Sequence, residues 1–215
     1  MERLKMNKST NSGDSNFKQS KEKDFSHFDE QASRWHQQIP KQTYDCIDQL
    51  IHQFNINQQH SILDIAAGTG VWLQRLHELN IYLNKYVAID VSTQMLNQLK
   101  TMFPEVETHC IDIEKEISLQ EKFDWVIVFN GTPHIKNMDM LFQNATKHLL
   151  KGGKLLIAHA RTRDGLNEHH KSIGFIPPFE PIPSEEHLRM LSAKYGLINV
   201  IIKDEPFFYY CAEKA

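Results

Sequence analysis

The chain has 215 residues, of which 40% are hydrophobic, and a formal net charge of −3. That length supports one packed domain rather than two, and the lack of a basic surplus argues against binding to a nucleic-acid backbone. The three cysteines, Cys46, Cys110 and Cys211, are widely spaced and form no C-x-x-C pair, which argues against a disulfide framework or a structural zinc site. No apolar run is long enough to span a membrane and the N-terminus lacks the apolar core of a signal peptide, so we expect a cytoplasmic protein.

The amino-acid composition of the chain changes near residue 25. Residues 1–24 are rich in Lys, Ser, Asn and Gln, which predicts a disordered tail; the alternative is a tail that becomes ordered over the active site. We expect residues 25–215 to form a single domain that begins with two helices. The apolar spacing that predicts them is carried by Phe25, Phe28, Ala32 and Trp35 in the first helix, and by Tyr44, Ile47, Leu50, Ile51 and Phe54 in the second, which Pro40 opens. Because no strand precedes these helices, we expect them to pack against the outside of the sheet.

Strand and helix patterns alternate through the rest of the chain. Strands are predicted at residues 61–65, 86–89, 106–111, 123–129, 154–159, 198–203 and 207–212. Helices are predicted at residues 71–80, 93–103, 138–150 and 185–195, with a stop and turn at 151–153. This alternation predicts an α/β fold with a doubly wound, mostly parallel seven-stranded sheet. The last two strands follow each other directly, so one of them should be antiparallel at the edge.

Side chains with binding chemistry fall where the first three strands end. The first strand runs into Asp64-Ile65-Ala66-Ala67-Gly68-Thr69-Gly70, a turn whose glycines allow close approach of a ligand to the backbone. The turn lacks the Lys-Ser/Thr of a P-loop and the G-x-G-x-x-G of a dinucleotide site. Asp90 ends the second strand, where a carboxylate can accept hydrogen bonds from both ribose hydroxyls; the alternative is a helix N-cap, a role that Ser92 can also fill. Asp112 ends the third strand and could accept from the amine of adenine.

The ordered series ILDIAAGTG, AIDVSTQML, CIDIE, FDWVIVFNGTPHI and LLKGGKLLIAHA resembles the class I methyltransferases that use S-adenosylmethionine (SAM). The resemblance covers roughly residues 26–212 and implies a Rossmann-like methyltransferase fold with N-terminal helices. It implies that the cofactor-binding residues are Asp64, Ala66, Gly68 and Gly70 around the methionine moiety, Asp90 on the ribose, Met95 on the adenine face, Asp112 and Ile113 at the adenine edge, together with Val91 and Asn130. The family's usual first glycine is Ala66 here. Since alanine resists a positive φ, we expect Ala66 to take an ordinary backbone conformation.

Two loops bear on the methyl acceptor. Residues 130–135 lack the N/D-P-P-Y/F sequence of enzymes that methylate amines of DNA bases or protein glutamines, which favours a small-molecule acceptor. Residues 159–170 form a long polar loop that resembles a subgroup of small bacterial and archaeal methyltransferases with a Ser/Thr-Arg…Asn…His signature. The matching residues here are Thr162, Arg163, Asn167 and His170.

The loop histidines leave several interpretations open. His134, His159 and His170 are the candidate catalytic residues, and His134 is the preferred general base because its loop adjoins the sulfonium in the family. The same three side chains could instead hold a metal, or simply line the pocket or lie on the surface; we assign no metal. The aromatic residues Phe25, Phe28, Trp35, Phe175 and Phe179 could form a lid, or those of the first helix could only anchor it to the sheet.

The sequence therefore predicts a SAM-dependent methyltransferase that transfers a methyl group to a small molecule, as a monomer or homodimer. The alternatives are a quinone or natural-product C- or O-methyltransferase and a non-catalytic SAM-binding regulator. An RNA methyltransferase is disfavoured by the charge balance.

Overall fold

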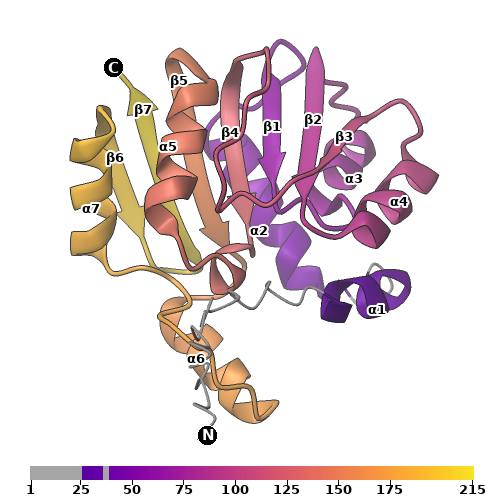
Figure 1. Ribbon diagram of the computed structural model, residues 1–215, viewed down its shortest axis with the longest axis vertical. Helices are drawn as coiled ribbons and strands as arrows, with labels where there is room; N and C mark the ends of the chain where they lie inside the picture. The colour runs from indigo at the N-terminus through magenta and orange to yellow at the C-terminus, as the bar shows by residue number, and fades with distance from the viewer. Residues whose placement is uncertain (1–25, 36–38) are drawn as a thin grey trace, which may run out of the picture.

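The computed structural model describes residues 26–35 and 39–215. Residues 1–24, predicted as a disordered tail, and Phe25 lie outside the described residues. Seven strands form one mixed sheet in the order β3-β2-β1-β4-β5-β7-β6 (Figure 1). The strands are β1 (Ser61–Ile65), β2 (Lys85–Asp90), β3 (Glu107–Cys110), β4 (Phe123–Phe129), β5 (Leu149–His159), β6 (Leu197–Lys203) and β7 (Phe208–Lys214).

The topology confirms the predicted doubly wound sheet. Strands β1 to β5 are parallel to their neighbours, whereas β7 lies antiparallel between β5 and β6. The last two strands thus include a reversed one, as their direct succession predicted, but the reversed strand β7 lies inside the sheet and β6 forms its edge. Strand order changes direction between β1 and β4, and this switch point is where open α/β sheets bind their ligands.

Helices cover both faces of the sheet. They are α1 (Ser26–Trp35), α2 (Lys41–Gln53), α3 (Val71–Glu78), α4 (Thr93–Met102), the short 3₁₀ helix η2 (Thr132–His134), α5 (Met138–His148), α6 (Arg163–Ser172) and α7 (Glu185–Lys194). Alternate residues of each strand point to opposite faces. Leu63 and Val126 thus join a core with α5 and α7, while Ile62 and Ile127 join a core with α2, α3 and α4. None of the helices in the described residues is long and apolar enough to cross a membrane.

The placement of α1 differs from the expectation. α2 packs on a sheet face as predicted, but α1 lies beside α4, beyond the carboxyl ends of the parallel strands (Figure 1). Asp29 of α1 accepts hydrogen bonds from Ser92 Oγ (2.5 Å) and from the backbone N–H of Gln94 (3.3 Å). A carboxylate is favoured there because the first turn of α4 carries free N–H groups and the positive end of the helix dipole.

Two local expectations near β5 are also corrected. Residues 151–153 were expected as a turn, yet they lie within β5, where the pairing with β4 shifts register between Phe123 and Trp125. A side chain at Gly153 would come within 2.9 Å of the Phe123 carbonyl, so the irregular strand requires a glycine. The polar segment after β5, expected as a loop, forms α6 from Arg163 onward because Thr162 Oγ1 caps it by accepting from Gly165 N–H (3.0 Å).

Candidate functional site

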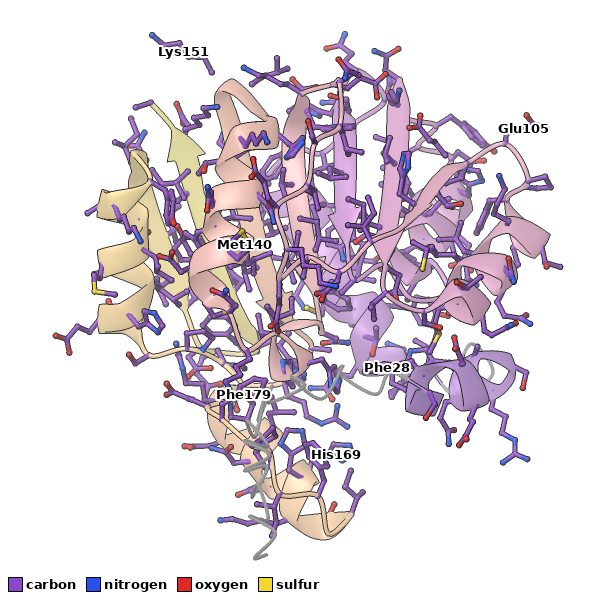
Figure 2. All side chains as sticks on the ribbon, in the orientation of Figure 1. Phe28, Glu105, Met140, Lys151, His169 and Phe179 are labelled. Carbon is purple, nitrogen blue, oxygen red and sulfur yellow. The ribbon has the colours of Figure 1, made fainter. Side chains whose placement is uncertain are left out.

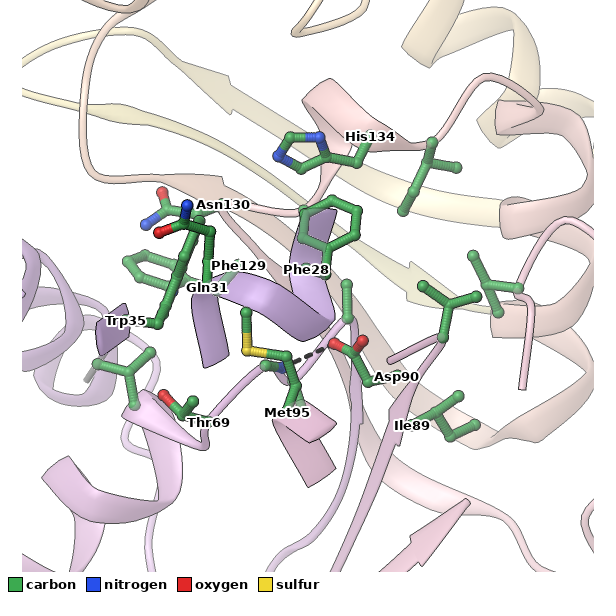
Figure 3. A pocket seen from close by; sticks show the side chains of 18 of the residues that line it. Phe28, Gln31, Trp35, Thr69, Ile89, Asp90, Met95, Phe129, Asn130 and His134 are labelled. Atoms are coloured by element: carbon green, nitrogen blue, oxygen red, sulfur yellow. Dashed lines mark hydrogen bonds between the residues drawn. The ribbon is translucent and has the colours of Figure 1, made fainter. Parts of the chain in front are cut away.

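A cavity of about 480 Å³ lies at the carboxyl ends of β1, β2 and β4, at the switch point of the sheet. The turn after β1, the ends of β2 and β4, and the segment after β3 form its wall, and α1 covers it with Phe28, Gln31 and Trp35 (Figure 3). Because several strand ends converge there, side chains distant in sequence face one space.

The turn after β1 has a left-handed backbone at three positions, Ala66 (φ +58°), Gly68 (φ +55°) and Gly70 (φ +86°). The expectation of an ordinary conformation at Ala66 is therefore wrong. The N–H of Ala67 donates to the carbonyl of Ile89 (3.1 Å) and the N–H of Gly70 donates to the carbonyl of Ala67 (2.9 Å). The first bond ties the turn to β2 and the second closes the turn, and together they outweigh the cost of about 1–2 kcal/mol for an alanine in the left-handed region.

Gly68 and Asp90 meet across the gap between β1 and β2. One carboxylate oxygen of Asp90 accepts from Gly68 N–H (2.8 Å) and the other from Ser92 N–H (2.8 Å). Ser92 caps α4 by accepting from Met95 N–H (3.1 Å), so the N-cap role falls to Ser92 and not to Asp90. Burial raises the pKa of Asp90, and the backbone N–H groups oppose that shift. Each carboxylate oxygen can accept two hydrogen bonds, so capacity remains for a ligand hydroxyl.

Most predicted cofactor-binding residues lie in the cavity wall. Ala66, Gly68, Asp90, Val91 and Met95 line it from β1, β2 and α4, and Asp112, Ile113 and Asn130 line it from the ends of β3 and β4 (Figure 3). Asp64 and Gly70 lie behind this wall. A side chain at Gly70 would come within 2.9 Å of Leu99 Cγ, so this glycine allows close packing against α4.

Asp64 is almost fully buried, with 2% of its surface exposed. The hydroxyl of Tyr86 donates a hydrogen bond to its carboxylate. Burial raises the pKa of Asp64 to about 7, the bond from Tyr86 opposes that rise, and the negative charge of Asp90 adds to it. This carboxyl therefore titrates near neutral pH directly beneath the turn.

Asn130 and His134 form the opposite side of the cavity. Asn130 N–H donates to the carbonyl of Ala158 (2.9 Å), and its side-chain oxygen accepts from Ala160 N–H (3.0 Å), which fixes Asn130 between β4 and β5. The ring of His134 meets the ring of Phe28 edge to face, with centroids 4.9 Å apart. Phe28 thus links α1 to the loop after β4.

The three candidate catalytic histidines do not share one space. His134 lines the cavity, whereas His159 and His170 do not. His159 Nδ1 accepts from Arg161 N–H (3.1 Å), and burial, followed by the positive charges of Arg161, His170, His134 and His169, lowers the pKa of His159 to about 3. Burial also lowers the pKa of His170, whose ring packs against Phe175 with centroids 4.9 Å apart. In the described parts of the chain, no cluster of His, Cys, Asp or Glu has the arrangement of a metal site.

The Thr-Arg part of the loop signature has a structural role here. Thr162 caps α6, and Arg163 pairs with Asp204 (3.0 Å) and lies over the ring of Phe208, 4.5 Å from its centroid. Asn167 is exposed and lies outside the cavity wall. The signature therefore fixes the start of α6.

Sequence reasoning missed Arg161 and His169, which both line the cavity. Arg161 lies two residues after the end of β5, so the strand-end rule that identified Asp90 and Asp112 would have found it. His169 is next to a predicted residue, His170, and only the helical phase of α6 decides which of the two faces the cavity. Gln31 shares a face with Phe28 and Trp35 on α1, a spacing that was available in the sequence.

Comparisons with known proteins agree with this geometry. Residues 62–153 match a family model described as a methyltransferase domain. Protein 235L of Invertebrate iridescent virus 6, which carries a provisional methyltransferase name, is 26% identical over 110 residues. That match covers 51% of this chain and only 41% of the viral protein, so it spans about two fifths of the relative's length.

Two solved structures share the fold along nearly their whole length. The first belongs to the complex between the Haloferax volcanii Trm112 methyltransferase activator and its methyltransferase partner, with a TM-score of 0.71, 12% identity, and coverage of 87% of this chain and 96% of that one. The second is the N-methyltransferase NodS from Bradyrhizobium japonicum WM9 with S-adenosylhomocysteine, with a TM-score of 0.65, 15% identity, and coverage of 88% and 97%. At these identities the likeness concerns the fold.

Proposed function

We propose that the chain is a class I SAM-dependent methyltransferase that binds SAM in the cavity at the switch point and methylates a small-molecule acceptor. The observation that carries the proposal is the Gly68–Asp90 pair with Asp112 in the same wall. In this arrangement one cavity is lined by a glycine with free space above it, by a carboxylate at the end of β2 that can bind ribose hydroxyls, and by a second carboxylate after β3.

The residues present fit the cofactor. A side chain added at Gly68 would meet no protein atom within 4 Å, so the space above this glycine is left open to a ligand. Asp90 would hold the ribose, Met95 would pack on the adenine face, and Asp112 with Ile113 would meet the adenine edge. When bound, SAM supplies a methyl group activated by a positively charged sulfur.

The chain's own contribution is to enclose and orient the reactants. α1 covers the cavity, and its attachment through Asp29 to Ser92 keeps Phe28 and Trp35 over the opening. Such enclosure excludes water and holds the acceptor close to the reacting methyl group. Because α1 bounds a cavity of about 480 Å³, a small molecule is favoured as acceptor over a polymer.

His134 is the residue that we assign to proton removal. It lies in the cavity wall beside Asn130, where an imidazole nitrogen can take a proton from a bound acceptor. His159 is a weak base because its pKa is about 3, and it lies with His170 behind the wall; we assign both a supporting role. A base is required for a hydroxyl or carbon acid acceptor and is less important for a thiol.

Turnover tests the proposal. Purified protein would be incubated with methyl-labelled SAM and fractionated small-molecule extracts, and S-adenosylhomocysteine formation would be followed. We expect turnover with at least one fraction, and a rate about 100-fold lower for His134→Asn with unchanged SAM affinity. His52→Asn, at an exposed position on α2, is the matched control. SAM binding without turnover in any fraction would favour a non-catalytic SAM-binding regulator instead.

A further inference from the structure

The carboxylates and the basic groups around the cavity come from different elements. Asp90, Asp112 and Glu114 lie at and after the ends of β2 and β3, Arg161 and His169 come from the β5 end and α6, and the exposed Arg34 lies on α1. Figure 2 shows Phe28 of α1 and His169 of α6 beyond the same end of the sheet. The side of the cavity near β5 therefore presents basic groups to whatever binds there.

Arg161 is held in place by its backbone. Its N–H donates to His159 Nδ1 (3.1 Å), and its carbonyl accepts from Phe208 N–H of β7 (3.1 Å). The residue is half-buried and lines the cavity. The backbone position from which the guanidinium extends is thus fixed by two strands.

Within the described ranges, the Arg161 guanidinium has no carboxylate within ion-pair distance and no hydrogen-bond acceptor. Three other arginines are paired, Arg75 with Asp48, Arg163 with Asp204 and Arg189 with Glu185, whereas Arg34 on α1, which also lines the cavity, is exposed to solvent. A partly desolvated cation without a partner is unfavourable, so this position gains free energy when an anion enters the cavity.

Several histidines lie near Arg161. His159 directly behind it has a lowered pKa, for which burial is the main cause and the charges of Arg161, His170, His134 and His169 are further causes. These groups therefore cluster around one point at the end of β5. Asn130 joins the cluster through its side-chain bond to Ala160 N–H.

We propose that Arg161 binds an anionic group of the methyl acceptor, a carboxylate or a phosphate, so that the substrates are anionic small molecules. The inference rests on the proposed function and names its substrate class. A guanidinium donates two parallel hydrogen bonds to either anion, which fixes orientation as well as position. Anchoring at Arg161 places the rest of the acceptor beside Asn130 and His134, and a ring N–H of His169 in the same wall is a second donor.

Binding of two probes to the full chain saturated with S-adenosylhomocysteine tests this proposal. Inorganic phosphate and acetate would be titrated at constant ionic strength, with calorimetry or NMR shifts as the readout. We expect Arg161→Gln to weaken binding of the preferred probe by at least about tenfold, the loss expected for a hydrogen bond to a charged group. For Arg161→Gln, the affinity for S-adenosylhomocysteine should stay within about twofold of wild type, and the unfolding temperature should stay within about 2 °C. Which probe binds more tightly distinguishes a phosphate from a carboxylate acceptor.

Arg189→Gln on α7 is the control for loss of charge, and Arg34→Gln tests the other arginine in the cavity wall. Both should retain probe binding. Equal probe affinity in wild type and Arg161→Gln would overturn the proposal. So would a tenfold loss of S-adenosylhomocysteine affinity in Arg161→Gln, because Arg161 would then hold the carboxylate of the cofactor. If wild type binds no S-adenosylhomocysteine, the proposed function fails. The anion site is then tested without that ligand, and weaker probe binding by Arg161→Gln than by wild type would still support it.

Discussion

The contact between the turn after β1 and the loop after β4 can be tested by substituting Gly131 and Ala66. Gly131 has φ −88° and ψ −27°, a conformation open to any residue, so only space limits a side chain there. An added Cβ would lie 2.9 Å from Ala66 Cβ and 3.1 Å from Val128 Cγ1, both shorter than an ordinary contact. Overpacking of this kind costs about 1–3 kcal/mol, and we expect Gly131→Ala to lower the free energy of unfolding by that amount.

Ala66→Gly should behave in the opposite way. The substitution relieves the strain of a left-handed backbone at φ +58°, which stabilises the folded state by about 1–2 kcal/mol. Part of this gain, about 0.4–1 kcal/mol, is lost because glycine gives the unfolded chain more conformational freedom. We expect Ala66→Gly to be stabilising by up to about 1.6 kcal/mol. In the double variant the 2.9 Å contact is gone, so it should be more stable than the sum of the single effects predicts, by about 1 kcal/mol or more.

Denaturant unfolding of the four proteins measures this coupling. In a domain of this size 1 kcal/mol corresponds to about 2–4 °C in Tm, so thermal unfolding provides an independent check. Additivity of the two substitutions within about 0.5 kcal/mol would refute the contact between the two loops. A strongly destabilised Ala66→Gly variant would refute the argument that alanine is strained in the turn.

Two further predictions concern the same wall. Gly68→Ala should weaken SAM binding by at least about tenfold because its methyl group enters the cavity. Gly174→Ala, at a similar φ (+69° against +55°) and with equally open surroundings but outside the cavity wall, should leave SAM binding unchanged in the same calorimetric titration. The pKa of Asp64 is about 7 in the folded protein and 3.8 ordinarily, so the folded protein binds this proton more tightly than the unfolded chain does. The free energy of unfolding should therefore fall as pH rises from about 4 to 7. Unfolding measured across this range should show that Asp64→Asn gains stability relative to wild type as pH rises; parallel curves would contradict the shift.

The strands were predictable because their patterns are local. The apolar runs of 61–65 and 123–129 coincide with β1 and β4, since buried parallel strands need continuous hydrophobic residues. The position of α1 was not predictable in this way. Its periodicity shows which face is buried, but the partner is set by the long-range bond between Asp29 and Ser92.

The candidate site shows the same division between local and tertiary information. The strand-end rule located Asp90 and Asp112, because the carboxyl ends of parallel strands converge whatever the loops do. It could not tell which loop histidine faces the cavity, since His159 lies behind Arg161 and His170 turns inward on α6. At Ala66, conformational preference was overridden by backbone bonds to β2, which no local rule contains.

Calorimetric titration of the full chain with SAM, beside Asp90→Asn and the exposed control Asp45→Asn, decides whether this cavity holds the cofactor. We expect saturable one-site binding to wild type and to Asp45→Asn. Asp90→Asn should bind about 10- to 100-fold more weakly, because it loses charge-assisted hydrogen bonds worth about 1.5–3 kcal/mol. Absence of SAM binding by the wild-type protein, or equal affinity in Asp90→Asn, would contradict the assignment of this cavity to the cofactor.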